Sequence, residues 1–177
     1  ALAQYFYVDK ATYPNGFNLT DLRIQGQNGQ DPVIEIYDGS RSISTASLIQ
    51  KVNYGFWAYN YPITLKEQIH FAPGSSFWVV AKFPAGAKNP LATGKTTRTD
   101  VAQYSFYSSD NGTTWTQLSE VLKGTSFEAV ASQLTWAVQA ISKNPDWSEV
   151  LNPEPISGEV RPNESQKVTL KNDGQKL

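Results

Sequence analysis

The chain lacks cysteine and methionine altogether, and it has a single histidine among its 177 residues. Without cysteine there is neither a disulfide framework nor a thiolate metal site, which is compatible with any cellular compartment. One histidine excludes a histidine-rich metal centre. The absence of methionine predicts that the chain begins after a processing site or at an artificial boundary, and that it is a piece of a longer protein.

Neither sign of charge is in excess, since the chain has 15 Lys and Arg residues and 16 Asp and Glu residues. Such a chain has no strong field to gather phosphates, so nucleic acids and anionic membranes are not expected partners. No apolar run approaches the roughly 20 residues that span a bilayer. No basic-then-apolar signal segment opens the chain. The sequence therefore predicts no membrane insertion.

Aromatic residues, by contrast, make up 12% of the chain, with 12 glycines and 10 prolines spread along it. This composition suits many short strands joined by tight turns. Apolar and polar residues alternate in most segments, which indicates about nine strands. The segments are 4–10, 17–27, 31–40, 46–65, 67–83, 102–110, 113–120 and 132–142. We predict an all-β fold, an antiparallel β-sandwich of jelly-roll or Greek-key type.

Breaks in the alternation predict where strands bend and end. The register slips between Leu19 and Leu22, which predicts a bulge or a turn. Asp38-Gly39 predicts a turn that closes a strand, and a second break falls near Tyr54-Gly55. Pro73-Gly74 stands between two β-rich runs and predicts a hairpin or a corner.

Two stretches lack a strand pattern, and the composition changes after Ser142. Residues 84–100 are poor in apolar side chains and predict a long loop. Residues 119–134 predict a short helix or a loop with one helical turn. We expect a β-sandwich domain over 1–143, followed over 144–177 by a linker and either a partial second domain or a tail packed on the first.

The C-terminal segment carries Trp147 and then "NPEPISGEVRPNESQKVTL". This run resembles the opening of immunoglobulin-like modules in secreted bacterial proteins, where it supplies the first two strands. About thirty residues are too few to close a second sandwich. We expect Trp147 to dock against the first domain and 157–170 to form a hairpin-like extension. Truncation after Ser142 with thermal melting and limited proteolysis would test this.

Residues 30–142 have a family resemblance of their own, carried by "PVIEIYDG", "PITLKEQIHFAPGSSFWVVAKFP", "SFYSSDNGTTWTQL" and "TWAVQAI". Their order and spacing are similar to those of the lectin-like β-sandwich domain attached to secreted bacterial and archaeal peptidases of the papain and subtilisin types. The resemblance implies a non-catalytic accessory module on an exported bacterial protein, secreted or at the cell surface. Its partners would be other domains of the same polypeptide, a glycan or an extracellular protein.

The stretch "SSDNGTTW" at 108–115 is similar to the Asp-box of sialidases and other propeller proteins. In such a hairpin the Asp accepts backbone N–H groups, the Gly takes a positive φ and the Trp packs beneath. A six-bladed propeller of about 45 residues per blade would need roughly twice this length, and only one box is present. We therefore interpret the box as structural. Its residues are Ser108, Asp110, Gly112, Thr114 and Trp115.

No catalytic residue is predicted. The single histidine, His70, lies between Ile69 and Phe71 in a strand whose alternation turns it away from the face that they share. A nucleophilic serine would therefore lack a histidine base. Paired carboxylates would have to come from Asp21, Asp31, Glu35, Asp38, Glu67, Asp100, Asp110, Glu120 and Glu128. Of these, Glu35 is the most interesting, as a half-exposed acid on one face with Val33 and Tyr37.

Calcium and an aromatic stripe remain as ligand-related signals. Asp38 and Asp110 stand in turns that offer oxygen donors, which makes them weak candidates for a structural Ca²⁺, although neither turn has EF-hand spacing. No other metal or cofactor is predicted.

Alternation places Trp57, Tyr59 and Tyr61 on one face, where an exposed stripe would bind sugar rings or a protein partner. The alternative is that another segment covers this face.

Three functions stay open. The first is a non-catalytic module, a peptidase accessory domain that serves in adhesion, substrate docking or spacing. The second is a carbohydrate-binding module that uses the aromatic stripe. The third, favoured only by the Asp-box, is a fragment of a sialidase-type glycoside hydrolase.

Overall fold

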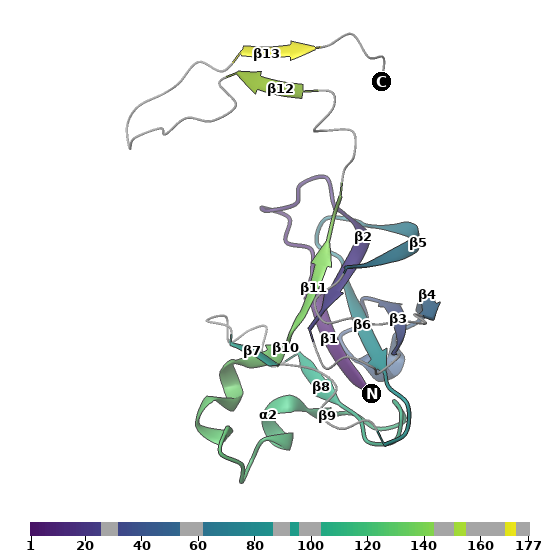
Figure 1. The fold of residues 1–177 in the computed structure, drawn as a ribbon, viewed down its shortest axis with the longest axis vertical. Helices are drawn as coiled ribbons and strands as arrows, with labels where there is room; N and C mark the ends of the chain where they lie inside the picture. The colour runs from purple at the N-terminus through teal and green to yellow at the C-terminus, as the bar shows by residue number, and fades with distance from the viewer. Residues whose placement is uncertain are drawn as a thin grey trace. The chain divides into compact units, whose positions relative to one another are not determined.

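The protein is built from antiparallel β-sheets, as seen in a computed structural model (Figure 1). The structure describes residues 1–25, 32–53, 62–86, 93–95, 104–143, 151–154 and 169–172. The chain divides into two compact units, Ala1–Ser142 and Lys143–Leu177. Every strand pair in both units is antiparallel, and the predicted all-β sandwich is confirmed. Its jelly-roll or Greek-key connectivity stays a prediction.

The larger sheet of the first unit has six strands in the order β4-β3-β6-β1-β8-β9. These strands are β1 (Leu2–Tyr7), β3 (Val33–Asp38), β4 (Leu48–Asn53), β6 (Ser76–Lys82), β8 (Ser105–Tyr107) and β9 (Thr116–Gln117). A short 3₁₀ helix, Ile43–Thr45, lies between β3 and β4. The chain order differs from the spatial order, because β6 and β1 enter the middle of the sheet.

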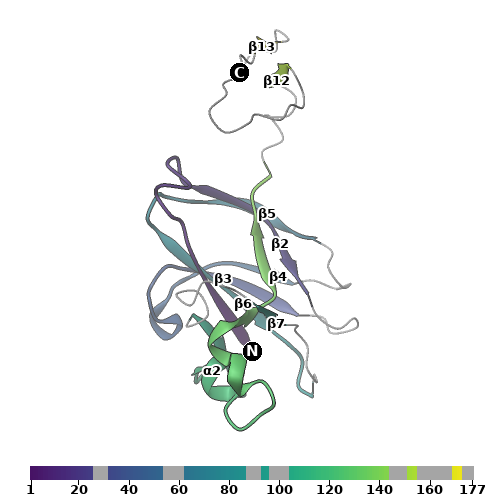
Figure 2. The same cartoon turned by 90° about the vertical axis from the view of Figure 1, so that its left-hand side faces the viewer.

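The smaller sheet has three strands in the order β11-β2-β5. They are β2 (Phe17–Ile24), β5 (Pro62–Phe71) and β11 (Val138–Ile141). The register shifts between Leu19 and Asp21, so the slip in the sequence is a bulge. Because β5 and β6 belong to different sheets, Pro73-Gly74 forms a corner between the layers (Figure 2).

The two sheets bury one apolar core between them. Alternation directs Ile34 and Ile36 of β3, and Phe77 and Val79 of β6, into this core. From the smaller sheet, Leu19, Leu22, Ile24, Ile63, Leu65 and Phe71 meet them. The opposite face of the six-stranded sheet has a second cluster, made of Ala3, Ile43, Trp78 and Val80. Both faces of β6 are therefore buried, as its continuous apolar run requires.

The last third of the first unit differs in detail from the sequence predictions. Within 84–100, described at 84–86 and 93–95, a short strand β7 (Thr93–Lys95) pairs with β10 (Leu134–Trp136). The predicted strand 132–142 is two strands, β10 and β11, which break at Ala137 and join different sheets. The stretch 119–134, predicted as a short helix or a loop with one helical turn, contains most of the four-residue helix α2 (Leu118–Val121) and a 3₁₀ helix, Glu128–Gln133.

The second unit has one described pair of strands, β12 (Leu151–Glu154) and β13 (Thr169–Asn172). They pair antiparallel, with Leu151 opposite Asn172 and Glu154 opposite Thr169. This ribbon begins and ends outside the predicted 157–170 extension, although both include 169–170. Trp147 lies outside the described residues. Among the described residues, no helix is long and apolar enough to cross a bilayer.

Candidate functional site

The Asp-box forms the tight turn between β8 and β9. The turn needs a left-handed backbone at two successive residues, Asn111 with φ 60° and Gly112 with φ 99°. Asparagine tolerates this conformation better than most side chains, and glycine adopts it freely. At the start of the box, the Ser108 N–H donates to the Ala1 carbonyl oxygen over 2.8 Å, which extends the contact of β8 with β1.

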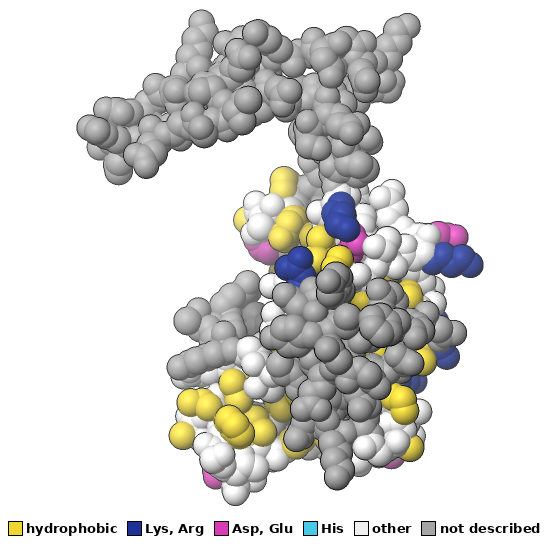
Figure 3. Space-filling view, in the orientation of Figure 1, with side chains coloured by type: hydrophobic (Ala, Val, Ile, Leu, Met, Phe, Trp, Pro, Cys, Tyr) yellow, Lys and Arg dark blue, Asp and Glu magenta, His cyan; other side chains and the backbone are white. Residues whose placement is uncertain are grey.

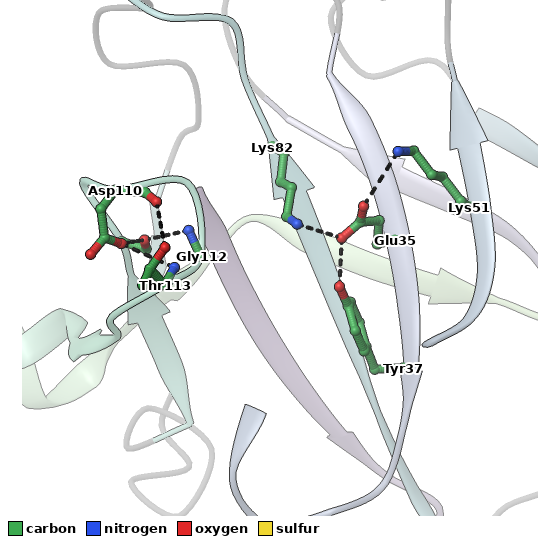
Figure 4. Close-up of polar contacts among 8 residues, drawn as sticks. Glu35, Tyr37, Lys51, Lys82, Asp110, Gly112 and Thr113 are labelled. Carbon is green, nitrogen blue, oxygen red and sulfur yellow. Dashed lines mark hydrogen bonds and ion pairs between the residues drawn. The ribbon is translucent and has the colours of Figure 1, made fainter. Parts of the chain in front are cut away.

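The Asp110 carboxylate accepts hydrogen bonds from the turn that it begins (Figure 4). Its Oδ1 accepts the backbone N–H groups of Thr113 and Thr114 over 3.1 and 2.9 Å, and the Ser108 hydroxyl over 2.7 Å. Its Oδ2 accepts the Thr114 hydroxyl over 2.6 Å. The Ser108 oxygen in turn accepts the Gly112 N–H over 2.7 Å. These bonds satisfy donors that an open turn would leave to water.

Hydrogen bonding to the charged form lowers the pKa of Asp110 well below its usual range. The largest cause is the Thr114 hydroxyl, followed by the Thr114 N–H and the Ser108 hydroxyl. An acid held in this way stays ionised at neutral pH and has no proton to donate to a leaving group. The carboxylate therefore acts as an acceptor for its own loop.

Trp115 lies against the turn. A Cβ atom added to Gly112 would stand 3.3 Å from Cζ2 of the Trp115 ring, so the ring packs on the glycine backbone. The ring is half-buried and packs against the second cluster, which contains Ala3 and Trp78. Among the box residues, Gly112 is thus restricted both by its φ and by space.

Asp110→Ala is expected to lower the melting temperature by about 2–6 °C, because the Thr113 and Thr114 N–H groups lose their acceptor. Asp110→Asn keeps one acceptor oxygen, so its melting temperature should lie between those of the original chain and of Asp110→Ala. Thermal melts by circular dichroism measure this, with the exposed acid Glu120 changed to Ala as the matched control. An unchanged melting temperature in Asp110→Ala would contradict the structural interpretation of the box.

Glu35 is buried, which corrects the expectation of a half-exposed acid. The residue is 5% exposed, on the face of β3 opposite Ile34 and Ile36. Its Oε2 is 2.8 Å from Lys82 Nζ and accepts the Tyr37 hydroxyl over 2.6 Å. Its Oε1 is 3.7 Å from Lys51 Nζ (Figure 4). Alternation correctly places Glu35 and Tyr37 together.

These contacts determine the charge of the Glu35 carboxyl group. Burial is the largest influence and raises the pKa of Glu35, but hydrogen bonds from Lys82 and Tyr37 and the charges of Lys82 and Lys51 outweigh it. The pKa of Glu35 is therefore lowered. Burial, then the hydrogen bond to Glu35, raises the pKa of Tyr37 well above its usual range. At neutral pH the cluster is a carboxylate held by two ammonium groups and a neutral phenol.

Lys82 was not singled out by the sequence, yet it stands between the two polar sites. Its Nζ binds Glu35, and its Cε would lie 3.5 Å from a Cβ atom added to Gly112. No local pattern around Lys82 signals this, because the contact depends on the pairing of β3 with β6, which sets Val33 opposite Lys82. Lys51 follows from register in the same way, since it lies opposite Glu35 on β4.

Asp38 and Asp110, the two calcium candidates, each accept hydrogen bonds from their own part of the chain. The Asp38 Oδ1 accepts the Ser47 N–H over 2.9 Å, which joins the two ends of the β3–β4 connection. In the part of the chain that the structure describes, no three His, Asp or Glu side chains are grouped as metal ligands. The two carboxylates thus use oxygens that a Ca²⁺ would need. A structural Ca²⁺ stays an untested prediction.

His70 and Asp21 make polar contacts between β2 and β5, whereas Asp31 and Asp100 lie outside the described residues. His70 is exposed, and its Nδ1 lies 2.7 Å from the Asn18 side-chain oxygen across the β2–β5 pair. Buried Asp21 accepts the hydroxyls of Thr20 and Thr64, over 2.7 and 2.8 Å. The aromatic stripe Trp57, Tyr59 and Tyr61 lies outside the described residues.

Comparisons with protein-family models, with curated proteins and with solved structures gave no match. The resemblances to a peptidase-associated lectin-like domain and to an immunoglobulin-like module therefore stay predictions.

Proposed function

We propose that the chain is a non-catalytic β-sandwich module of an exported bacterial protein, an accessory domain of a secreted or cell-surface peptidase. It serves in adhesion, in substrate docking or as a spacer. One observation supports this most: the acids that the sequence singles out are used to hold the fold. Asp110 holds its turn, and Asp38 accepts the Ser47 N–H across the β3–β4 connection. Glu35 forms ion pairs with two lysines.

Most glycoside hydrolases use two carboxyl groups that face a substrate about 5–10 Å apart, one of them protonated near neutral pH. The pKa values of Glu35 and Asp110 are both lowered, so both acids are ionised near neutral pH and neither is the protonated group. Glu35 is also too buried to face a sugar ring. This supports the accessory role over a glycoside hydrolase that works with two carboxylates.

The purified chain is expected to show no turnover of sialosides, of other glycosides or of peptides above the buffer rate. Fluorogenic substrates of each class measure this over a pH range of about 4–9, where a general acid or base would operate. A matched sample of Asp110→Asn controls for contaminating hydrolases, since a contaminant acts equally in both. Turnover that a single carboxylate substitution abolishes would overturn the proposal.

The binding role is tested separately by a glycan array and by a screen of extracellular proteins. If the chain is an accessory domain, it should bind a protein or cell-surface target. Asp110→Ala should bind that target equally well as long as the variant is folded. Specific retention on a glycan, lost on substitution of Trp57, would favour the carbohydrate-binding alternative instead. The screens thus separate the two functions without reference to catalysis.

A further inference from the structure

The turn of the Asp-box contains an Asn-Gly pair, Asn111-Gly112, whose covalent chemistry no role described so far uses. An Asn-Gly pair is prone to lose ammonia, because glycine has no side chain to shield its backbone nitrogen from the preceding amide. The chain has two more such pairs, Asn15-Gly16 and Asn28-Gly29. The last pair lies outside the described residues, so the structure allows a comparison of Asn111 with Asn15.

The reaction begins at the backbone nitrogen of Gly112. Hydroxide removes the proton of this nitrogen, and the lone pair that remains attacks Cγ of the Asn111 side chain. A bond forms between these two atoms, and the bond from Cγ to Nδ2 breaks. The leaving nitrogen takes a proton from water and departs as ammonia, which restores the hydroxide. Water then opens the succinimide ring at either carbonyl, which gives aspartate or isoaspartate.

Solvent has access to the side chain that would react. Asn111 is exposed in the turn between β8 and β9, where its backbone has φ 60°. Water and hydroxide can therefore reach its amide, and ammonia can leave. Exposure alone would leave Asn111 open to deamidation.

The fold, however, holds the proton that the reaction must remove. The Gly112 N–H donates to the Ser108 hydroxyl oxygen over 2.7 Å (Figure 4). Ser108 is only 2% exposed, so water competes little for this oxygen. The Ser108 hydroxyl gives its own proton to Asp110 Oδ1 over 2.7 Å, which turns its lone pairs towards Gly112. The charge of Asp110 also polarises the hydroxyl and makes it a stronger acceptor.

Packing restricts the movement that the attack requires. To reach Cγ of Asn111, the Gly112 nitrogen must leave Ser108 and rotate. A Cβ atom added to Gly112 would stand 3.3 Å from Trp115 Cζ2 and 3.5 Å from Lys82 Cε, so the backbone is packed on that side. The reaction therefore needs a local opening of the turn.

The Asn15-Gly16 pair is held by a different kind of acceptor. Asn15 is exposed as Asn111 is, and the Gly16 N–H donates to the Tyr13 carbonyl oxygen over 3.0 Å. That acceptor belongs to the backbone, so no side-chain substitution deletes it. At Asn111 the acceptor is a side chain that a single substitution removes. Asn15 is thus a control within the same molecule.

We propose that Asn111 is a latent deamidation site and that the Ser108 hydroxyl protects it by holding the Gly112 N–H. Ser108 is then a positioning residue for the turn, in addition to its contact with Asp110. The proposal does not depend on the accessory role, because the reaction needs only solvent.

Modification at this site should open the hairpin. Isoaspartate adds a methylene group to the main chain of a turn in which Asp110 must reach the N–H groups of Thr113 and Thr114. Helix α2 follows β9 directly, so it depends on this hairpin for its position. Figure 3 shows hydrophobic side chains gathered at the surface over this part of the chain, and Val121 and Phe127 are exposed there. The modified chain should therefore melt lower and associate with itself more readily.

The test incubates the full chain in mildly alkaline buffer and follows each Asn-Gly pair by peptide mapping with mass spectrometry. Ser108→Ala is expected to raise the deamidation rate at Asn111 about three- to tenfold, the factor that corresponds to the loss of one hydrogen bond. The rate at Asn15 in the same molecules should not change. In urea, where the turn is absent, Asn111 should react equally fast in the original chain and in Ser108→Ala.

Thr114→Val separates the role of Ser108 from a general loosening of the turn. This variant loses the 2.6 Å hydrogen bond to Asp110 Oδ2 but keeps the bond between Ser108 and Gly112. Its rate at Asn111 should stay close to that of the original chain. Circular dichroism shows whether each variant is folded at the incubation temperature. The Gly112 amide of the original chain should also exchange its hydrogen slowly, which is measured without any variant.

Any of four outcomes would overturn the proposal. The first is an equal rate at Asn111 in the original chain and in a folded Ser108→Ala. The second is a rise of the same size in Thr114→Val. The third is an original chain whose Asn111 reacts as fast when folded as in urea. The fourth is a Gly112 amide that exchanges as freely in the folded chain as in urea, and this result decides the question even where Ser108→Ala does not fold.

Discussion

Trp78→Ala is expected to lower the free energy of unfolding by about 3–5 kcal/mol, one of the largest effects of any single substitution in this chain. The Trp78 side chain is 0% exposed and fills the centre of the second cluster. Its ring meets Tyr5 and Phe106 edge-on, with centroids 4.9 and 5.6 Å apart. Its Nε1–H also donates to the Ser40 carbonyl over 2.6 Å.

Trp78→Phe separates the two contributions, since it keeps a ring but leaves the Ser40 carbonyl without this donor. It should cost less than Trp78→Ala, with about 1–3 kcal/mol from the unpaired group. Phe127→Ala is the control, because that ring is 56% exposed and its loss should change stability little. Urea unfolding followed by far-UV circular dichroism measures all three. Equal stability of Trp78→Ala and the original chain would show that this cluster is not packed as described.

Glu35→Ala is expected to lower the free energy of unfolding by about 3–5 kcal/mol, because removal of one partner leaves a poorly compensated charge. Lys82 Nζ would lose its 2.8 Å contact, and the Tyr37 hydroxyl would lose its acceptor. The part of Lys82 that reaches solvent limits the cost to the lower half of this range, since its ammonium group can move towards water.

The double variant Glu35→Leu with Lys82→Met tests whether charge or packing matters. Replacing a whole buried pair by apolar groups of similar size is often neutral, so the double variant should be more stable than Glu35→Ala. The exposed pair of Glu120 and Lys123, 2.6 Å apart, provides the control. Lys123→Met should leave the melting temperature unchanged. A double variant that is less stable than Glu35→Ala would contradict the role assigned to the pair.

The same cluster predicts an acid limit of stability. The folded-state pKa of Glu35 is lowered from its ordinary value of 4.5, so the unfolded chain binds the proton more tightly. The contribution of Glu35 is therefore fully present above that value and is lost as pH falls through the folded-state pKa. Melting temperatures are measured from pH 6 downwards in steps of about one pH unit. They should fall more steeply for the original chain than for Glu35→Gln. Parallel curves would contradict the shift.

Local chemistry determined much of the fold from the sequence alone. Period-2 alternation placed Glu35 and Tyr37 on one face of a strand and Ile34 and Ile36 on the other, because successive side chains of a strand point to opposite faces. The Asp-box contacts also follow from a short stretch, since its donors and acceptors are all within a few residues of Asp110. The slip after Leu19 was visible in the sequence as a bulge or a turn, and the register of β2 with β5 shows that it is a bulge.

Tertiary structure alone decided which segments meet. Alternation assigns a face to each strand but not its neighbour, so nothing near Lys82 signalled that β6 would bring it to Glu35. The break at Ala137, which sends β10 and β11 to different sheets, follows from sheet closure and not from a change in pattern. The stack of phenylalanine rings exists only because Phe6, Phe17 and Phe77, which come from β1, β2 and β6, converge where the two sheets meet. Such contacts depend on long-range pairing, and no local period of the sequence encodes it.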